Sequence, residues 1–329
     1  MFSVREQQAP PGHSERGGQT MRVAARRISV RLSRLVSGAY HRHSVSSGKR
    51  DACPTHDTES EGEAVKLSIL SNYLGNEDVS LPRLAEIGYR RVEVRRNQEI
   101  ETPVAELRRI ASDCGIELHS MMNWHPGIAD ADAKVRAEVL ERLRISIGWA
   151  AEAGLRVIET VAMWDGEPPQ RPDAWKRAVA SYQEAGALAA QHGITLAIEP
   201  ITGRTGRLVH TLAQAVAMAN EVGLDSVRVM GDTHHMHYEE QDPVRATRDA
   251  GPWLVHFHFS DEDRLPPSMG HMDVIGILRA LAEVGYDGSV SLSEMAKVPD
   301  AETAARAAYH FMQGAIQLAQ LRERMLRGV

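Results

Sequence analysis

Hydrophobic and polar positions alternate regularly from about Val65 to the end of the chain. Short apolar runs rich in β-branched residues are each followed by a longer run in which apolar residues recur every three or four positions. The first pattern predicts buried strands and the second predicts amphipathic helices. The eight strand candidates are KLSIL at 66–70, RVEV at 91–94, IELHSMM at 116–122, RVIETVA at 156–162, TLAIEP at 195–200, VRVMGD at 227–232, LVHFHFS at 254–260 and SVSLSE at 289–294.

Glycine marks the junctions between these runs. Six of the helical runs end in a glycine shortly before the next strand, at Gly88, Gly115, Gly154, Gly193, Gly223 and Gly285. Glycine is the residue most often found just beyond the last turn of a helix. Strict alternation of strands and helices predicts a parallel sheet, and eight units in about 265 residues match a closed (β/α)8 TIM barrel. The last helix is predicted from about Asp300 to Arg327.

The first 63 residues do not follow this pattern. The segment 21–50 is rich in Arg and Ser and lacks acidic residues, a composition that resembles an organelle transit peptide. Three readings remain open: a disordered extension or sequence upstream of the true start, a targeting segment, and a nucleic-acid-binding arm. We therefore expect a disordered or targeting-like extension over 1–63 and one catalytic barrel over 64–329.

Charge and cysteine content restrict the function of the barrel. The formal net charge is -6, but residues 1–50 carry ten Lys or Arg and only two acidic residues, so the remainder is strongly acidic. An acidic surface argues against a nucleic-acid partner. Two cysteines exclude a disulfide scaffold and favour a reducing compartment. No apolar run approaches the roughly 18 residues of a membrane span, so we expect a cytoplasmic protein with no membrane partner. Motifs for nucleotide cofactors, GxGxxG after a strand or GxxxxGK[ST], do not occur.

Four polar residues stand at the C-terminal ends of strand candidates: Glu199, Asp232, His258 and Glu294. A barrel gathers these strand ends at one face, so we expect the four side chains to converge. A buried carboxylate costs several kcal/mol unless a cation or a hydrogen bond compensates it. Carboxylate oxygens with one imidazole suit a hard divalent cation. The alternative for each carboxylate alone is a helix cap or an arginine pair.

Histidines cluster near two of these strand ends. His258 lies in HFHFSD, with His256 two residues earlier on the same strand face. We expect His258 to be a ligand and His256 to lie deeper in the barrel. The segment GDTHHMH places His234, His235 and His237 in a predicted loop above the strand end. We expect one of these three to contact the substrate.

These motifs resemble those of the xylose isomerase-like TIM barrels of the sugar phosphate isomerase/epimerase group, over roughly residues 65–320. The family's metal ligands correspond to the Glu of an xxEP strand end, the Asp of DxxH, the second His of HxH and the Glu that ends the last strand. In this sequence those positions are Glu199, Asp232, His258 and Glu294, and His235 is the histidine of DxxH. The resemblance implies that these four residues bind one metal ion.

Two further motifs of the family are present in part. An arginine six residues after the ligand histidine, which contacts substrate in the epimerase branch, is matched by Arg264. The loop P-G-x-G-x-I-D is matched at 267–273 by PSMGHMD, which keeps the Pro, the second Gly and the Asp. One residue departs: ketose epimerases carry a second Glu where this chain has Thr205. Arg204 and Arg207 beside it could receive a carboxylate or a phosphate.

The resemblance implies a sugar (phosphate) isomerase or epimerase that acts on a hydroxy-ketone through a metal-stabilised enediolate. Mn²⁺, Mg²⁺ or Co²⁺ would act as the Lewis acid, and Glu199 and Glu294 would move the proton. His235, Arg264, His125 and Trp124 are the predicted substrate contacts, Trp124 as an aromatic wall. The predicted partner is a small sugar or keto-acid. A homo-oligomer is a further expectation from the resemblance.

Three alternatives remain open. A dehydratase of the same superfamily, similar to 3-dehydroshikimate or inosose dehydratases, would share the first proton abstraction and need an acid such as His125, His234 or His237. A DNA-repair enzyme with several zinc ions would need further ligands, for which Glu159 and His119 are the candidates. A non-catalytic carbohydrate-binding barrel would keep only the pocket.

Overall fold

The computed structural model describes residues 65–95, 102–164, 171–204 and 208–327. The chain divides into two units, 1–59 and 60–329, and every described residue lies in the second. The predicted extension over 1–63 is therefore outside the described residues, and its assignment stays a prediction.

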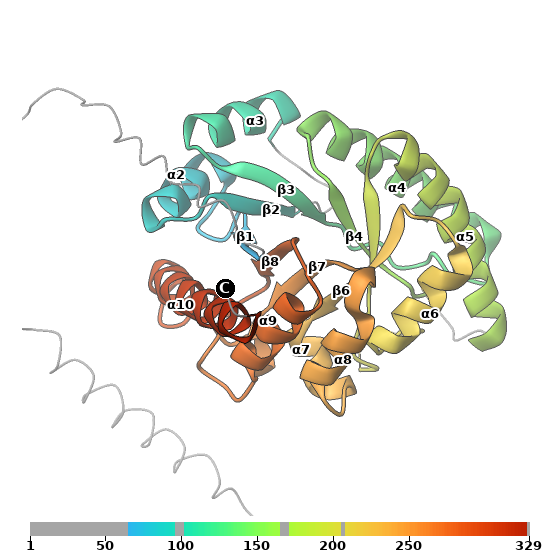
Figure 1. The fold of residues 1–329 in the computed structure, drawn as a ribbon. Coiled ribbons are helices and arrows are strands. Elements are labelled where there is room, and N and C mark those ends of the chain that lie inside the picture. Colours follow the sequence, from blue (N-terminus) through green and yellow to red (C-terminus); the bar gives the residue numbers. More distant parts are fainter. Residues whose placement is uncertain (1–64, 96–101, 165–170, 205–207, 328–329) are drawn as a thin grey trace, which may run out of the picture. The chain divides into compact units, whose positions relative to one another are not determined.

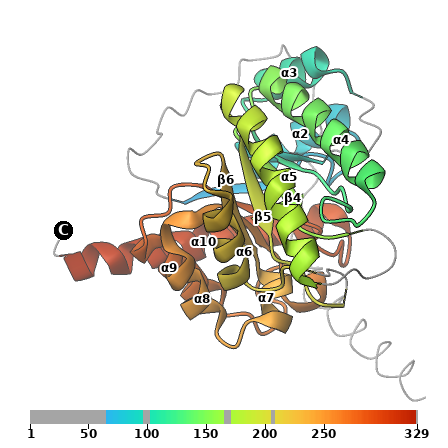
Figure 2. The same cartoon turned by 90° about the vertical axis from the view of Figure 1, so that its right-hand side faces the viewer.

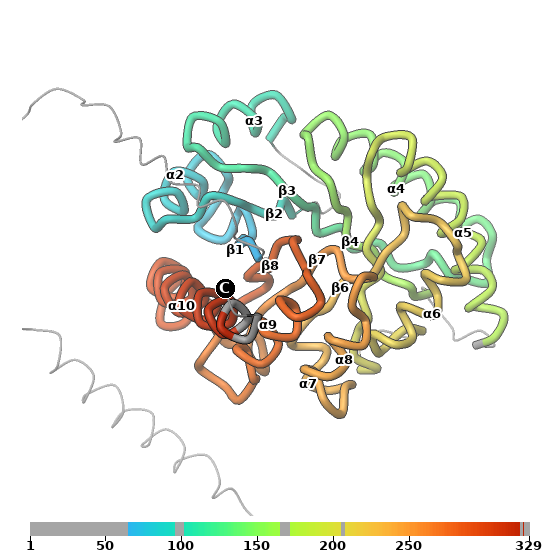
Figure 3. Tube along the Cα trace, viewed as in Figure 1, coloured from blue at the N-terminus to red at the C-terminus, as the bar shows by residue number. Residues whose placement is uncertain are grey.

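Eight parallel strands form a closed barrel in chain order, with β1 hydrogen-bonded to β8. The ring of strands with its outer layer of helices is seen in Figure 1 and, as a tube, in Figure 3. The predicted TIM barrel is confirmed. The strands are β1 (Lys66–Leu70), β2 (Arg91–Arg95), β3 (Glu117–Met122), β4 (Val157–Val161), β5 (Thr195–Glu199), β6 (Val227–Asp232), β7 (Leu254–Phe259) and β8 (Ser289–Leu292).

Amphipathic helices cover the outside of the barrel because their apolar faces pack on the strands. Figure 2 shows that the final turns of α10 extend beyond the barrel body. In the part of the chain that the structure describes, no helix is long and apolar enough to cross a membrane. The helices are α2 (Glu77–Ile87), α3 (Val104–Asp113), α4 (Ala133–Ala153), α5 (Arg171–Gln191), α6 (Leu212–Val222), α7 (Thr233–Glu239), α8 (Pro243–Ala250), α9 (Val274–Glu283) and α10 (Ala301–Arg327), with short 3-10 turns η1 (Gly251–Trp253) and η2 (Glu262–Arg264).

Residues of β7 alternate between the two faces of the barrel wall. His256 and His258 point inward, where both contact Glu93 of β2 across the barrel. Phe257 and Phe259 alternate with them and belong to the apolar core between strands and helices, as the period of two in a strand requires. The interior of this barrel is polar in its middle, with fully buried side chains at Ser68, Glu93, Ser120, Glu159, His256 and Ser291.

The six glycines predicted to end helices all have positive φ angles, between 63° and 123°. Gly88 is the most constrained of them, because a Cβ there would lie 2.5 Å from the Tyr309 hydroxyl of α10. Its φ of 123° also disfavours any side chain.

We expect Gly88→Ala to lower the free energy of unfolding by about 2–4 kcal/mol, because strain in the backbone and overpacking add. Urea unfolding followed by circular dichroism measures this change. Gly314→Ala in α10 is the matched control, since its Cβ would meet open space and Ala favours a helix by about 0.5–1 kcal/mol over Gly. Equal effects of the two substitutions would contradict the packing argument.

Polar contacts of Arg91 link β2 to β3 and β8 at the N-terminal ends of these strands. Arg91 at the start of β2 donates from Nε to Glu117 Oε2 at 3.0 Å and from Nη1 to Ser289 Oγ at 2.8 Å. The neighbouring His119 and Arg91 lower the pKa of Glu117 to about 2. Because this folded-state pKa is depressed, the pair stabilises the fold above the ordinary pKa of 4.5, and that contribution is lost as the pH falls towards 2.

We expect Glu117→Gln to flatten the loss of stability between about pH 5 and about pH 3, roughly the upper part of that titration. The free energies of unfolding of the wild type and of Glu117→Gln should differ by less than about 1 kcal/mol, because the Glu117 side chain is half exposed and solvent screens the pair. Urea unfolding at the two pH values measures it. Glu152→Gln on the exposed face of α4 should leave the pH slope at its wild-type value.

Candidate active site

Three of the predicted ligands come together at the C-terminal ends of neighbouring strands. Glu199 ends β5, Asp232 ends β6, and His258 lies beside Asp232 in the β6–β7 register. His258 Nδ1 is 3.5 Å from Asp232 Oδ2 and 3.7 Å from Glu199 Oε1. All three side chains are buried. Their donor atoms therefore face one small volume inside the mouth of the barrel.

Asp232 also begins the next helix. Its Oδ1 accepts hydrogen bonds from the backbone N–H groups of His234 at 2.8 Å and His235 at 3.4 Å, so it caps α7. The prediction of a loop here was therefore wrong, because His234, His235 and His237 lie in a helix. This cap brings His235 back towards the site, with Nε2 3.9 Å from Glu199 Oε1. One donor atom from each of Glu199, Asp232 and His235 lies within 4.8 Å of the others, a spacing that fits a metal ion.

Arg264 lies over this cluster. Its Nη1 donates to Asp232 Oδ2 at 2.7 Å, and its Nη2 is 3.2 Å from His235 Nε2. Burial would raise the pKa of Asp232, but Arg264, His235 and His258 hold it well below its ordinary value. Asp232 is therefore an anion, and its Oδ2 faces the centre of the site.

Glu294 is placed differently from the other predicted ligands. Strand β8 ends at Leu292, two residues earlier than the sequence pattern indicated, and Glu294 follows with a φ of 48°. Its carboxylate lies 2.9 Å from Arg95 Nη2, and its side chain is 35% exposed. It belongs to neither of the two groups of metal-ligand type that the described residues form. Its roles as ligand and catalyst stay predictions.

The two predicted contacts after β3 lie at the same end of the barrel. Trp124 is 37% exposed. His125 lines a small recess with Asn123, Thr160 and Val161. The roles of Trp124 and His125 towards a substrate also stay predictions.

A buried glutamate in the middle of β2 was missed by the sequence analysis. Glu93 Oε1 lies 2.9 Å from His256 Nε2, and its Oε2 lies 2.9 Å from His258 Nε2. Ser120 Oγ donates to Oε1 at 3.2 Å. Burial would raise the pKa of Glu93, but His258 and His256 hold it well below its ordinary value. The signal was present in RVEVR, where one acid interrupts a buried strand.

Glu159 of β4 is the second interior acid, considered from the sequence only for a zinc site of the DNA-repair type. It is fully buried, and neither carboxylate oxygen has a hydrogen-bond partner among the described residues. Burial and then the charge of Glu199 raise its pKa well above the ordinary value. Its Oε2 lies 3.9 Å from His258 Nε2, so Glu159 lies close to the site.

The buried carboxylates favour positive charge near two side chains, His258 and Arg264. Burial would lower the pKa of His258, but Glu93, Asp232 and Glu199 raise it well above its ordinary value. Burial likewise opposes the charge on Arg264, but Asp232, Glu199 and Glu294 raise its pKa. The carboxylates around His258 and Arg264 thus favour a positive charge in this part of the barrel.

The β5–α6 connection is described only in part. Arg204 is exposed and stacks over the Tyr238 ring at 5.7 Å. Thr205 and Arg207, which the sequence analysis singled out, lie outside the described residues. The predicted anion contact by these arginines stays a prediction.

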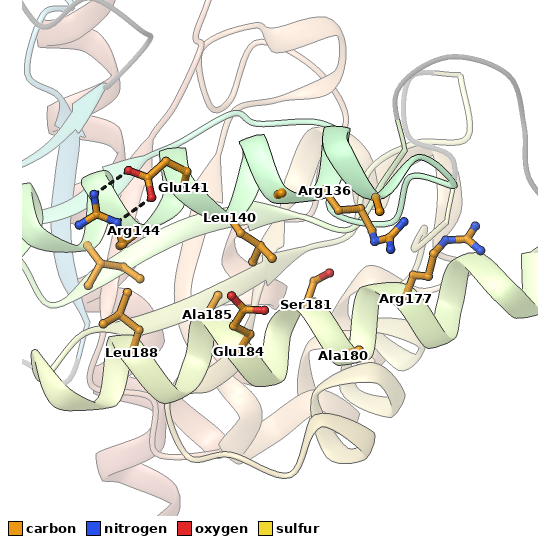
Figure 4. Close-up of a pocket in the computed structure, with 13 residues that line it drawn as sticks. Arg136, Leu140, Glu141, Arg144, Arg177, Ala180, Ser181, Glu184, Ala185 and Leu188 are labelled. Atoms are coloured by element: carbon orange, nitrogen blue, oxygen red, sulfur yellow. Dashed lines mark hydrogen bonds and ion pairs between the residues drawn. The ribbon is translucent and has the colours of Figure 1, made fainter.

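A groove of about 550 Å³ lies elsewhere, on the outer helix layer between α4 and α5. Figure 4 shows Arg136 and Arg177 at one end and the Arg144–Glu141 ion pair at the other. None of the predicted site residues lines it. Its lining comes from helices alone, whereas TIM-barrel enzymes carry their chemistry at strand ends. We therefore assign the chemistry to the mouth of the barrel.

Comparisons with known proteins agree with this geometry. D-psicose 3-epimerase of Agrobacterium fabrum is 28% identical over 227 residues, which are 66% of this chain and 78% of that protein. L-ribulose 3-epimerase of Mesorhizobium japonicum is 27% identical over 64% of this chain and 73% of that protein. The solved D-psicose 3-epimerase of Clostridium cellulolyticum, at 21% identity, has the same fold over 76% of this chain and 99% of its own length, with a TM-score of 0.70.

The curated relatives are thus sugar epimerases, as the resemblance predicted, and a sugar isomerase-type enzyme is the shared class. A family model matches residues 81–315, which span seven of the eight strands and the site. The chain belongs to the xylose isomerase-like TIM barrel family.

Proposed function

We propose that this protein is a divalent-metal-dependent epimerase or isomerase of a small hydroxy-ketone sugar, acting through an enediolate. The observation that carries the proposal is the convergence of buried donor atoms at the strand ends, where Glu199 and Asp232 each offer a carboxylate oxygen within 4.8 Å of the other and of a His235 nitrogen. His258 Nδ1 faces the same two carboxylates. The named relatives support the reaction class, because they are 3-epimerases of D-psicose and L-ribulose.

The donor set fits a divalent cation. Asp232 Oδ1 caps α7, and its Oδ2, which accepts a hydrogen bond from Arg264, lies 3.5 Å from His258 Nδ1. Glu199, Asp232 and His258 would hold the ion, with Glu294 as the predicted fourth ligand, and oxygen-rich sites of this kind suit Mn²⁺, Mg²⁺ or Co²⁺. When bound, the cation supplies Lewis-acid stabilisation of the negative charge that develops on the substrate oxygens.

Proton transfer falls to the two glutamates. Glu199 is buried at the base of the site, where its carboxylate would remove the proton beside the substrate carbonyl. Glu294 lies at the rim and would return a proton from its own side. Delivery to the other face of the same carbon gives an epimer, whereas delivery to the neighbouring carbon gives an aldose–ketose pair.

Arg264 and His235 would orient the substrate. Arg264 lies 2.7 Å from Asp232 and keeps its positive charge through that contact, so its guanidinium can also donate to substrate hydroxyl groups. His235 lies beside both and would bind a second substrate oxygen. Trp124 at the mouth offers an aromatic face to a sugar ring.

Solvent deuterium exchange tests this function. The full-length chain loaded with Mn²⁺ is incubated in D₂O with D-psicose, D-fructose, L-ribulose and a set of keto-acids, and the products are followed by NMR. Deuterium beside the carbonyl together with an epimer or isomer, lost on chelation and regained with Mn²⁺, is the expected result. Loss of water from a substrate would identify the dehydratase instead. No exchange on any ketose, with or without metal, would refute an enolising site.

A further inference from the structure

The two inward histidines of β7 share one carboxylate. Glu93 is fully buried in β2, and each of its oxygens lies 2.9 Å from an imidazole, Oε1 from His256 Nε2 and Oε2 from His258 Nε2. Ser120 Oγ donates to Oε1 from the neighbouring strand β3. Both oxygens are thus engaged, and Glu93 is held between three strands of the barrel.

This contact determines which nitrogen of His258 is free to act as a ligand. An imidazole nitrogen 2.9 Å from a carboxylate oxygen must carry a proton, because two lone pairs would repel at that distance. The proton therefore lies on Nε2 of His258. Its Nδ1 points the other way, 3.5 Å from Asp232 Oδ2 and 3.7 Å from Glu199 Oε1.

We propose that Glu93 is a positioning residue, which holds His258 in the Nε2–H tautomer and in the ring orientation that presents Nδ1 to the metal. This inference rests on the proposed function, since it assigns His258 Nδ1 as a ligand. Carboxylates that accept the second N–H of a ligating histidine commonly fix its ring and raise its basicity. Here the acid comes from β2, on the far side of the barrel from the site carboxylates.

His256 holds the Glu93 carboxylate in place. It binds the other oxygen of Glu93 and is itself fully buried, so Glu93 cannot rotate without losing both imidazole contacts. The barrel interior around it is formed by strands, and the positioning group therefore lies on rigid elements.

A rival reading of the same atoms is a second cation held by Glu93, His256 and His258, whose donor atoms also lie within 4.8 Å of one another. Such an ion would take the lone pair of His258 Nε2 and leave the remaining proton on Nδ1, facing two carboxylates. The two readings thus require opposite tautomers of His258. We favour the hydrogen-bonded one because it leaves the lone pair of Nδ1 free for a metal ion that Asp232 and Glu199 would also bind.

The tautomer can be read directly. Long-range ¹H–¹⁵N spectra of the full chain, labelled at histidine and loaded with Mg²⁺, are compared with those of His258→Asn to assign the His258 signals. The proposal requires a proton on Nε2 and none on Nδ1. A proton on Nδ1, or two Mn²⁺ ions per chain of which one is lost in Glu93→Gln, would overturn it.

Mn²⁺ affinity measured by titration calorimetry provides the second test. Glu93→Gln should weaken Mn²⁺ binding by about 10–100-fold, and saturating Mn²⁺ should restore much of the activity. In a His258→Asn background, Glu93→Gln should weaken Mn²⁺ binding by less than about threefold, because the imidazole that Glu93 holds is already absent. Glu117→Gln, at the other end of the barrel, is the carboxylate control and should leave affinity unchanged.

These measurements separate two kinds of failure. Wild-type protein that binds Mn²⁺ while Glu93→Gln binds it equally well would refute the positioning role and leave the proposed function standing. If Glu93→Gln lowered Mn²⁺ affinity equally in the wild-type and His258→Asn backgrounds, Glu93 would have only a structural role. Wild-type protein that binds none of Mn²⁺, Mg²⁺ or Co²⁺ would refute the proposed function itself.

Discussion

Glu199→Gln should lower kcat/KM by at least about 10³-fold, because under the proposed function one substitution removes both a general base and a metal ligand. The Glu199 carboxylate is buried, lies 3.7 Å from His258 Nδ1 and shares the site with Asp232. An amide keeps the shape of the side chain but carries no negative charge and is a poor base. The measurements are kcat/KM on the best ketose of the D₂O screen and the metal content of the purified protein by elemental analysis.

The fall in activity has to be separated from a fall in stability. Glu138→Gln on the exposed face of α4 is the matched control, and both its activity and its metal content should stay at wild-type values. The midpoint of thermal unfolding in the presence of chelator should show that Glu199→Gln is folded. A Glu199→Gln protein that keeps its metal and more than a tenth of its activity would contradict the assignment of this residue.

Phe257→Ala should lower the free energy of unfolding by about 3–5 kcal/mol, the largest stability effect we expect, because it leaves a cavity in a close-packed core. Phe257 is fully buried in β7, and its ring lies 5.1 Å from that of Phe259 between centroids. Ring carbons of Phe257 occupy the space beside Gly231, where an added Cβ would lie only 2.5 Å from them. The backbone of β6 cannot close in further to fill the gap.

Chemical unfolding followed by intrinsic fluorescence and circular dichroism measures this loss. Phe311→Ala removes the same ring from α10, where Phe311 is only partly buried against the core. Phe311→Ala should lower the free energy of unfolding by less than half as much as Phe257→Ala, since part of the Phe311 surface already meets water. If both substitutions cost the same, the fit between Phe257 and Gly231 is not what stabilises this part of the barrel.

The order and type of the strands could be predicted because buried parallel strands are short, β-branched and bounded by glycine. The bounds of β1 and β6 agree with the pattern to the residue, whereas β8 ends two residues before Glu294. Serine is compatible with either a strand or a loop, so SVSLSE gave no clear end. Glu294 has a positive φ of 48°, which the local sequence pattern does not indicate.

The site was predicted where strand ends carry acids and missed where chemistry lies within a strand. Glu199 and Asp232 follow apolar runs and were singled out, while Glu93 lies among arginines and valines in RVEVR. Its partners are 163 and 165 residues away along the chain, a separation that periodicity does not bridge. His235 was expected in a loop above the strand end, but the Asp232 side chain caps a helix there.

In β7, histidines that face the barrel interior alternate with phenylalanines that pack in the core, so the site and the core depend on the same strand register. A slip of this strand by one residue would turn both phenyl rings into the barrel and both imidazoles towards the helices. A molecule with that error would lose its apolar packing and, under the proposed function, its metal-binding nitrogen together. Activity per mole of total protein would then report the fraction of correctly registered molecules in a preparation.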